Sequence, residues 1–206
     1  MRKNRFVKEY LEPIVIAIVI ALFIRTFIVQ AFKIPSSSME PTLLVGDHLL
    51  VNKFIYGVKL PLTNVKLLKW KNPQRGDIIV FIYPKDPSKD FIKRVIAVEG
   101  EKVQIVQNKI YINDKPIEDR WGFYGDNNPS VRLPPTFEDY GPKIVPKDSL
   151  FVMGDNRNNS QDSRYWGYVN INAVRGKALI IYLSWNQLAQ DLLQKIRWDR
   201  FGKLIR

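Results

Sequence analysis

The chain has 206 residues, a net charge of +12 and no cysteine. The lack of cysteine excludes a disulfide framework, a thiol nucleophile and a thiolate metal site. His48 is the single histidine, and this argues against a zinc site, which usually takes several histidine or cysteine ligands. The positive charge fits nucleic acid or anionic lipid as a partner, but the basic residues are spread along the chain and fit a solvated surface equally well.

Residues 11–32 predict a single transmembrane helix. The segment is mostly apolar, and about 20 such residues are needed to cross a bilayer. Arg25 lies toward one end, where its side chain can reach the headgroups. Four basic residues precede the segment, so the positive-inside rule puts residues 1–10 in the cytoplasm and residues 33–206 outside the membrane.

Two other readings of this segment remain open. The uninterrupted apolar stretch 14–24 fits the core of a cleavable signal peptide, and Val29-Gln30-Ala31 fits its cleavage site. The apolar character resumes at Phe27, however, which favours a retained anchor. A buried core helix of a cytosolic protein is the third reading.

Beyond residue 33 the sequence predicts a mainly β domain. Residues 102–112 alternate polar and apolar and predict a hairpin that turns at Asn108-Lys109. Thirteen prolines and eleven glycines disfavour long helices. Residues 119–148, rich in proline, glycine and asparagine, predict a loop or small extension. Short apolar runs predict further strands at residues 77–83, 91–98, 149–153 and 178–183.

Residues 34–43, IPSSSMEPTL, offer a candidate catalytic serine directly after the apolar segment. Ser37 and Glu40 have the spacing of a helix capping box, which is a structural alternative. Pro41 weakens that alternative because it disfavours helical geometry at the residue before it. A serine-rich linker also remains possible.

Residues 91–98, FIKRVIAV, place a lysine in an apolar strand. Lys93 would share a strand face with Phe91, Val95 and Ala97. Desolvation there lowers the pKa of the amine, and a neutral amine can act as a general base. The alternatives are a lysine that reaches solvent from an edge strand, or one paired with a carboxylate.

Residues 153–164, MGDNRNNSQDSR, are dense in turn formers and in charges of both signs. Arg157 and Ser160 stand where a calcium loop requires an oxygen ligand and a glycine, so calcium binding is excluded. A hydrogen-bonded loop that supports a site remains. A Ser-His-Asp triad would have to use His48, but a lone histidine more often packs or lies at the surface, and lysine is an accepted base for serine.

The three stretches, in this order behind an apolar segment, resemble bacterial type I signal peptidase, also called leader peptidase. Its boxes are matched by residues 35–43 (serine box), 75–81 (strand box), 92–94 (lysine box) and 154–164 (C-terminal signature). The family usually has aspartate where this chain has Asn158. The resemblance spans residues 34–167 and implies a coiled β-sheet catalytic domain with short helices, carried on one transmembrane helix.

The resemblance also implies roles for individual residues. Ser38 would be the nucleophile and Lys93 its general base. The Ser38 N–H and the Ser36 hydroxyl would form the oxyanion hole. Ser160 would orient the Lys93 amine.

Further residues would support the site or bind substrate. Asp155 would pair with Arg94, and Asp162 with Arg164. Shallow apolar pockets for small side chains would be formed by Phe32, Ile34, Met39 and Ile92.

The implied activity is a serine endopeptidase without metal or organic cofactor. It would sit in the bacterial inner (cytoplasmic) membrane and remove signal peptides from exported preproteins after an Ala-x-Ala site. Signal peptides and membrane lipid would be its partners, and nucleic acid would not. The rivals are a related processing peptidase, a non-enzymatic exported β-domain, and a nucleic-acid binder, which would lack a recognisable module.

Overall fold

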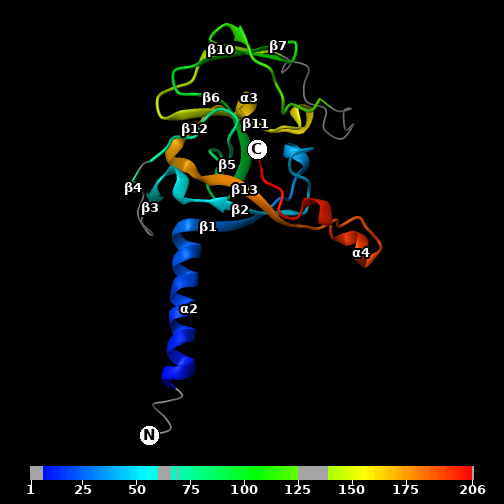
Figure 1. Cartoon of the computed structure of the whole chain (residues 1–206). Helices are drawn as coiled ribbons and strands as arrows, with labels where there is room; N and C mark the ends of the chain where they lie inside the picture. Colours follow the sequence, from blue (N-terminus) through cyan, green and yellow to red (C-terminus); the bar gives the residue numbers. More distant parts are fainter. Residues whose placement is uncertain (1–6, 60–65, 69, 125–138, 206) are drawn as a thin grey trace.

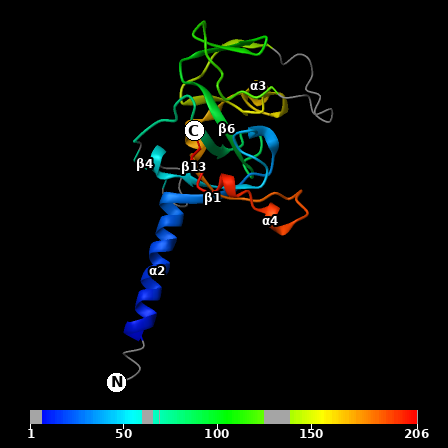
Figure 2. The same ribbon diagram turned by 45° about the vertical axis from the view of Figure 1, so that its right-hand side comes forward.

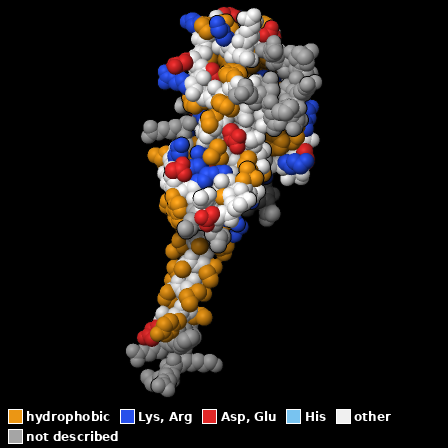
Figure 3. All heavy atoms as spheres, turned by 90° about the vertical axis from the view of Figure 1, so that its right-hand side faces the viewer, with side chains coloured by type: hydrophobic (Ala, Val, Ile, Leu, Met, Phe, Trp, Pro, Cys, Tyr) orange, Lys and Arg blue, Asp and Glu red, His pale blue; other side chains and the backbone are white. Residues whose placement is uncertain are grey.

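A projecting helix and a mainly β domain make up the computed structural model, which describes residues 7–59, 66–68, 70–124 and 139–205 (Figure 1). The helical part consists of three consecutive pieces, η1 (Val7–Leu11), α2 (Glu12–Phe23) and η2 (Ile24–Ile28). Every residue of α2 is exposed, and hydrophobic side chains cover the face seen in Figure 3. Of the helices in the described ranges, none is both long and apolar enough to cross a membrane.

The helix ends earlier than the segment 11–32 predicts. Val29–Lys33 form strand β1, which pairs antiparallel with β2 (Asp47–Asn52). The apolar residues that resume at Phe27 concealed this change in the sequence. The change follows from pairing with β2, whose residues alternate between fully and partly buried, as a strand with one covered face does.

The main sheet has seven strands in the order β1-β2-β13-β5-β6-β11-β12. Its pairings are all antiparallel. The longest strand, β13, lies between β2 and β5 and pairs with both, and each of the two pairings contains shifts of register. The remaining strands of this sheet are β13 (Val174–Ser184), β5 (Ile78–Ile82), β6 (Asp90–Val98), β11 (Ser149–Met153) and β12 (Val169–Asn170).

A second sheet of four strands lies at the end of the domain away from α2 (Figures 1 and 2). Its order is β10-β7-β8-β9, with bounds β10 (Tyr140–Ile144), β7 (Lys102–Val106), β8 (Lys109–Ile112) and β9 (Lys115–Pro116). The β7–β8 hairpin turns at Gln107 and Asn108, with φ of 47° and 63°, one residue earlier than predicted. Strand β10 lies within residues 119–148, so that region is not a loop throughout.

Short elements complete the fold. Strands β3 (Val58–Lys59) and β4 (Lys66–Leu68) form a two-stranded sheet. The helical turns are η3 (Ser37–Met39), η4 (Phe54–Tyr56), η6 (Arg157–Asn159), α3 (Ser163–Trp166), η7 (Ile171–Ala173), α4 (Leu192–Lys195) and η8 (Trp198–Arg200). The prediction of a mainly β domain with short helices is confirmed.

Strand β6 runs through the junction of three hydrophobic clusters. Ile92 packs against the cluster that contains Ile34. Val95 belongs to a second cluster, and Ile96 to a third. Because all three meet along one strand, the residues in its middle are shielded from water, and Lys93 and Arg94 lie there.

Candidate active site

Ser38 and Lys93 meet although they lie far apart in the sequence. Ser38 belongs to the turn η3, and Lys93 to strand β6. The Lys93 Nζ donates a hydrogen bond to Ser38 Oγ over 2.6 Å and another to the carbonyl oxygen of Ile92 over 3.0 Å. Ser38 is 9% exposed and Lys93 is 4% exposed. A serine hydroxyl and a lysine amine are therefore in direct contact within the core.

Burial lowers the pKa of the Lys93 amine to about 8. The negative charges of Asp162 and Asp155 oppose this shift because they favour the protonated amine, while Arg164 adds to the lowering. A substantial fraction of the amine is then neutral at mildly alkaline pH. A neutral amine 2.6 Å from a hydroxyl can accept its proton.

The pair lies in a cleft of about 410 Å³. Residues 35–38 line one side and residues 90–93 the other, and residues 159–161 complete the lining. Ser36 is exposed in this cleft, with its Oγ 3.4 Å from Ser38 Oγ. A second hydroxyl is thus beside the first, on the side that solvent can reach.

A buried ion pair flanks the lysine. Arg94 and Asp155 are fully buried and form a two-pronged contact of 2.8 and 2.7 Å. Asp155 also accepts a hydrogen bond from Thr42 Oγ1 at 2.6 Å, and Arg94 donates to the carbonyl oxygen of Gly76 at 2.8 Å. The ring of Trp121 covers the guanidinium of Arg94 at 4.6 Å. The charges are therefore satisfied within the protein, as burial requires.

A second ion pair closes the loop that follows β11. Asp162 accepts from Arg164 Nε at 2.8 Å and from its Nη2 at 2.9 Å. It also accepts from the backbone N–H of Gly154 at 3.1 Å. Arg164 in turn donates to the carbonyl oxygen of Arg157 at 2.7 Å. The two ends of residues 154–164 are tied together in this way.

The resemblance implies that Ser160 orients the Lys93 amine, but the structure shows no hydrogen bond between them. Its Oγ is buried and finds no hydrogen-bond partner among the described residues. The Lys93 amine instead donates to Ser38 and to the backbone of Ile92. Ser160 does line the cleft, and its Oγ lies against Gly154, where an added Cβ would come within 2.3 Å of it.

The four apolar residues implied for substrate binding gather in one place, but differ in access. Ile92 lines the cleft. Ile34 and Met39 are buried in the core cluster beneath it, and Phe32 is half-buried against the same cluster. Ile34, directly after β1, and Met39, the last residue of η3, point into the core cluster and do not line the cleft.

His48 lies outside the cleft. It stands in strand β2 and packs edge-on against Tyr182, with ring centres 5.9 Å apart. Its position gives it no part in the Ser38–Lys93 contact.

Sequence reasoning missed the residues that hold the serine segment. The backbone N–H of Asn156 donates to the Ser38 carbonyl oxygen at 3.1 Å, and Asn159 Nδ2 donates to Ser37 Oγ at 2.8 Å. The many asparagines marked the loop 153–164 as unusual, but they did not indicate that it binds the serine segment. Asp119, which binds Arg157, carried no local signal at all.

A serine and a lysine in hydrogen-bond contact at the floor of a cleft have the arrangement of the Ser-Lys variant of serine hydrolases. Comparison with known proteins places the chain in a peptidase family. Residues 7–185 match the family described as signal peptidase, peptidase S26. The chain belongs to this family.

Individual relatives are described as signal peptidase I. Signal peptidase I of Pseudomonas fluorescens is 36% identical, over 90% of this chain and 75% of the relative. Signal peptidase I of Leptolyngbya laminosa is 39% identical, over 88% of this chain and 82% of the relative. A crystal structure of signal peptidase I from Enterococcus faecalis is 31% identical, with a TM-score of 0.42, and covers 52% of this chain and 97% of that one.

Proposed function

We propose that this chain is a membrane-anchored serine endopeptidase that removes signal peptides from exported preproteins. The observation that carries the proposal is the 2.6 Å contact between Lys93 Nζ and Ser38 Oγ in a cleft, with the pKa of the amine lowered to about 8. Membership of the signal peptidase family supplies the substrate class.

In the proposed mechanism Ser38 Oγ attacks the scissile carbonyl carbon while neutral Lys93 takes its proton. The oxyanion that forms accepts hydrogen bonds from the Ser38 N–H and the Ser36 hydroxyl. Lys93 then gives its proton to the leaving amine, which leaves an ester on Ser38. Lys93 next activates a water that hydrolyses this ester, and the free serine returns.

The shape of the cleft supports an extended substrate with small side chains. Two segments, 35–38 and 90–93, border the cleft, and a peptide can add between them through backbone hydrogen bonds. Ile92 gives the lining an apolar contact, and it packs against the buried cluster of Ile34 and Met39, which forms a packed floor behind it. Bulky side chains would overlap with this floor, so cleavage after a small-x-small (Ala-x-Ala) site is expected.

The membrane anchor is part of the same proposal. Apart from Glu12 at its start, the residues of α2 are exposed and apolar on all sides, and a helix of that kind needs an apolar surrounding. The basic N-terminal residues then favour a cytoplasmic N-terminus and a catalytic domain on the outer side of the cytoplasmic membrane. An anchor beside the site raises the local concentration of substrates held in the same bilayer.

The test is cleavage of a preprotein by the detergent-solubilised full chain, with the cleavage position read by mass spectrometry. Wild type should cut after a small-x-small site. Ser38→Ala and Lys93→Ala should each abolish cleavage and leave the circular dichroism spectrum unchanged. Retained cleavage in folded Ser38→Ala would refute the mechanism.

A further inference from the structure

Asp119 neutralises an arginine that is otherwise enclosed by protein. Arg157 is fully buried and Asp119 is 13% exposed. Arg157 donates from Nε to Asp119 at 3.0 Å and from Nη2 at 2.6 Å, and from Nη1 to the carbonyl oxygen of Gly154 at 3.2 Å. Without Asp119 the guanidinium would be a buried charge with no counter-ion among the described residues, which protein interiors rarely tolerate.

The residues after Asp119 form a short bridge with the same loop. Phe123 donates its N–H to the carbonyl oxygen of Asp155 at 2.7 Å, and accepts from the N–H of Arg157 at 2.9 Å. Phe123 thus pairs in parallel with Asn156. Asp119 fixes its own turn by accepting from the N–H of Gly122 at 3.1 Å.

On its other side, Asn156 holds the serine segment. Its N–H donates to the Ser38 carbonyl oxygen at 3.1 Å, and its Nδ2 donates to the Ser37 carbonyl oxygen at 3.3 Å. The order of contacts therefore runs from Asp119 through Arg157 and Asn156 to the backbone of Ser38. A displacement of Arg157 would therefore shift Asn156 and, through its hydrogen bond, the backbone of Ser38.

The same short segment also reaches the lysine. Trp121 covers the guanidinium of Arg94 at 4.6 Å, and Arg94 is the neighbour of Lys93 in strand β6. The ring also lies against Gly76, where an added Cβ would come within 3.2 Å of it. Residues 119–123, termed here the brace, therefore contact the supports of both Ser38 and Lys93.

We propose that Asp119 is a positioning residue for the Ser38–Lys93 pair. By holding Arg157 it fixes Asn156, and Asn156 fixes the Ser38 carbonyl and with it the direction of the hydroxyl. The inference rests on the proposed function, and assigns a role to the start of the region 119–148. Asp119 does not line the cleft and so acts on the rate of chemistry, not on substrate binding.

The test compares Asp119→Asn with wild type as full chains in detergent. A misalignment of about 1 Å costs up to about 100-fold in rate, so kcat for preprotein cleavage should fall by about 10- to 100-fold with KM within about twofold. The alkaline rise of kcat/KM should also move to higher pH, because a loosened site admits water to Lys93. Asp119→Glu, which keeps the charge, should recover part of the loss.

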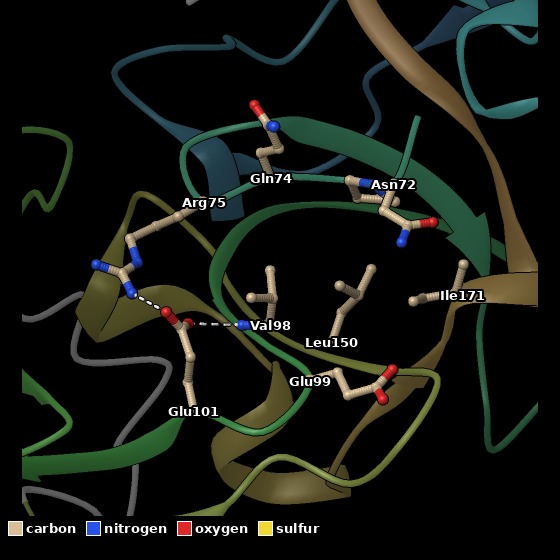
Figure 4. Close-up of a pocket in the computed structure, with 9 residues that line it drawn as sticks. Asn72, Gln74, Arg75, Val98, Glu99, Glu101, Leu150 and Ile171 are labelled. Atoms are coloured by element: carbon tan, nitrogen blue, oxygen red, sulfur yellow. Dashed lines mark hydrogen bonds and ion pairs between the residues drawn. The ribbon is translucent and has the colours of Figure 1, made fainter. Parts of the chain in front are cut away.

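Glu101→Gln is the matched control. Glu101 also binds an arginine, Arg75, and accepts from the N–H of Val98 at 2.9 Å (Figure 4). The Glu101 side chain is 21% exposed and that of Asp119 is 13% exposed. Glu101, however, borders a separate hollow beside Leu150. This variant should lose stability without a change in kcat or in the pH midpoint.

Two further measurements separate the brace from the proposed function. Acylation of Ser38 by an alanine-containing peptide p-nitrophenyl ester, followed by nitrophenol release, should be slower in Asp119→Asn. Amide hydrogen exchange in residues 154–160 should be faster in that variant. A wild-type chain that cleaves no preprotein would refute the proposed function, and acylation and exchange would still decide the brace. If folded Asp119→Asn keeps the wild-type kcat, acylation rate and amide exchange rate, the proposal that Asp119 is a positioning residue is overturned.

Discussion

The sharpest prediction concerns pH, because one buried amine must be neutral for the proposed chemistry. Burial lowers the pKa of Lys93 to about 8, whereas an ordinary lysine titrates near 10.5. At pH 7 the neutral fraction is then about 9%, against about 0.03% for a solvated lysine. The protein environment therefore supplies roughly a 300-fold gain in active base at neutral pH.

The assay is kcat/KM for preprotein cleavage from pH 6 to 10, since this ratio reports groups of the free enzyme. Below pH 8 the value should fall about tenfold per unit, as the amine becomes protonated, and above it the value should level off. Lys93→Arg is the control, because a guanidinium stays charged throughout this range and should give no activity at any pH.

Two outcomes would refute the reasoning. A profile that is flat from pH 6 to 10 would show that Lys93 is not the base. A value that still rises about tenfold per unit up to pH 10 would show that the amine titrates like a solvated lysine in the working enzyme, contrary to its 4% exposure.

Other predictions concern the loop behind the pair. Gly154→Ala would bring a Cβ within 2.4 Å of the Ser38 carbonyl oxygen and 2.3 Å of Ser160 Oγ, so cleavage should fall by up to about 100-fold and unfolding by urea should show a loss of about 1–3 kcal/mol. An unshifted rate would contradict the close packing. Asp155→Asn removes the carboxylate charge that pairs with the buried guanidinium of Arg94 and should lower the free energy of unfolding by about 3–5 kcal/mol, measured by the same method; a change below about 1 kcal/mol would show that this ion pair contributes little.

Strands with a strong local pattern were predictable from the sequence. The apolar runs 77–83, 91–98 and 149–153 appear as β5, β6 and β11, because proline, glycine and charged residues bound each run. Strand β10, with the sequence YGPKI, was not predictable. Its glycine and proline disfavour a strand, and it forms through pairing with β7, a contact that local sequence does not encode.

The residues of the site likewise divide into those that the sequence could predict and those that it could not. Lys93 could be selected because a lysine among apolar strand residues is a local anomaly, whereas Ser38 was indicated by the resemblance of residues 35–43 to the serine box of the family. The bond between Asp119 and Arg157 could not, since it joins two segments that only the fold brings together. For Ser160 the resemblance implied a place at the site, and the structure puts it in the lining of the cleft, but neither the resemblance nor local sequence determines the orientation of its hydroxyl.

The lowered pKa of Lys93 depends on a detail of charge balance. Asp155 and Asp162 both favour the protonated amine, yet each carboxylate is bound by its own arginine. The Asp162–Arg164 ion pair can be broken by replacing either partner. The two replacements should move the pH midpoint of kcat/KM in opposite directions. Arg164→Met frees the Asp162 carboxylate and removes a repelling cation, so the pKa of Lys93 should rise.

Asp162→Asn removes the attracting charge and leaves Arg164 unpaired, so the pKa of Lys93 should fall. Both variants lose the same contact of 2.8 Å, so each serves as the control for the other. General loosening of the loop would move both midpoints upward, toward the value of a solvated lysine. Midpoints that separate on the two sides of pH 8 can only come from the charges themselves, and midpoints that rise together would contradict this account of how the base is kept neutral.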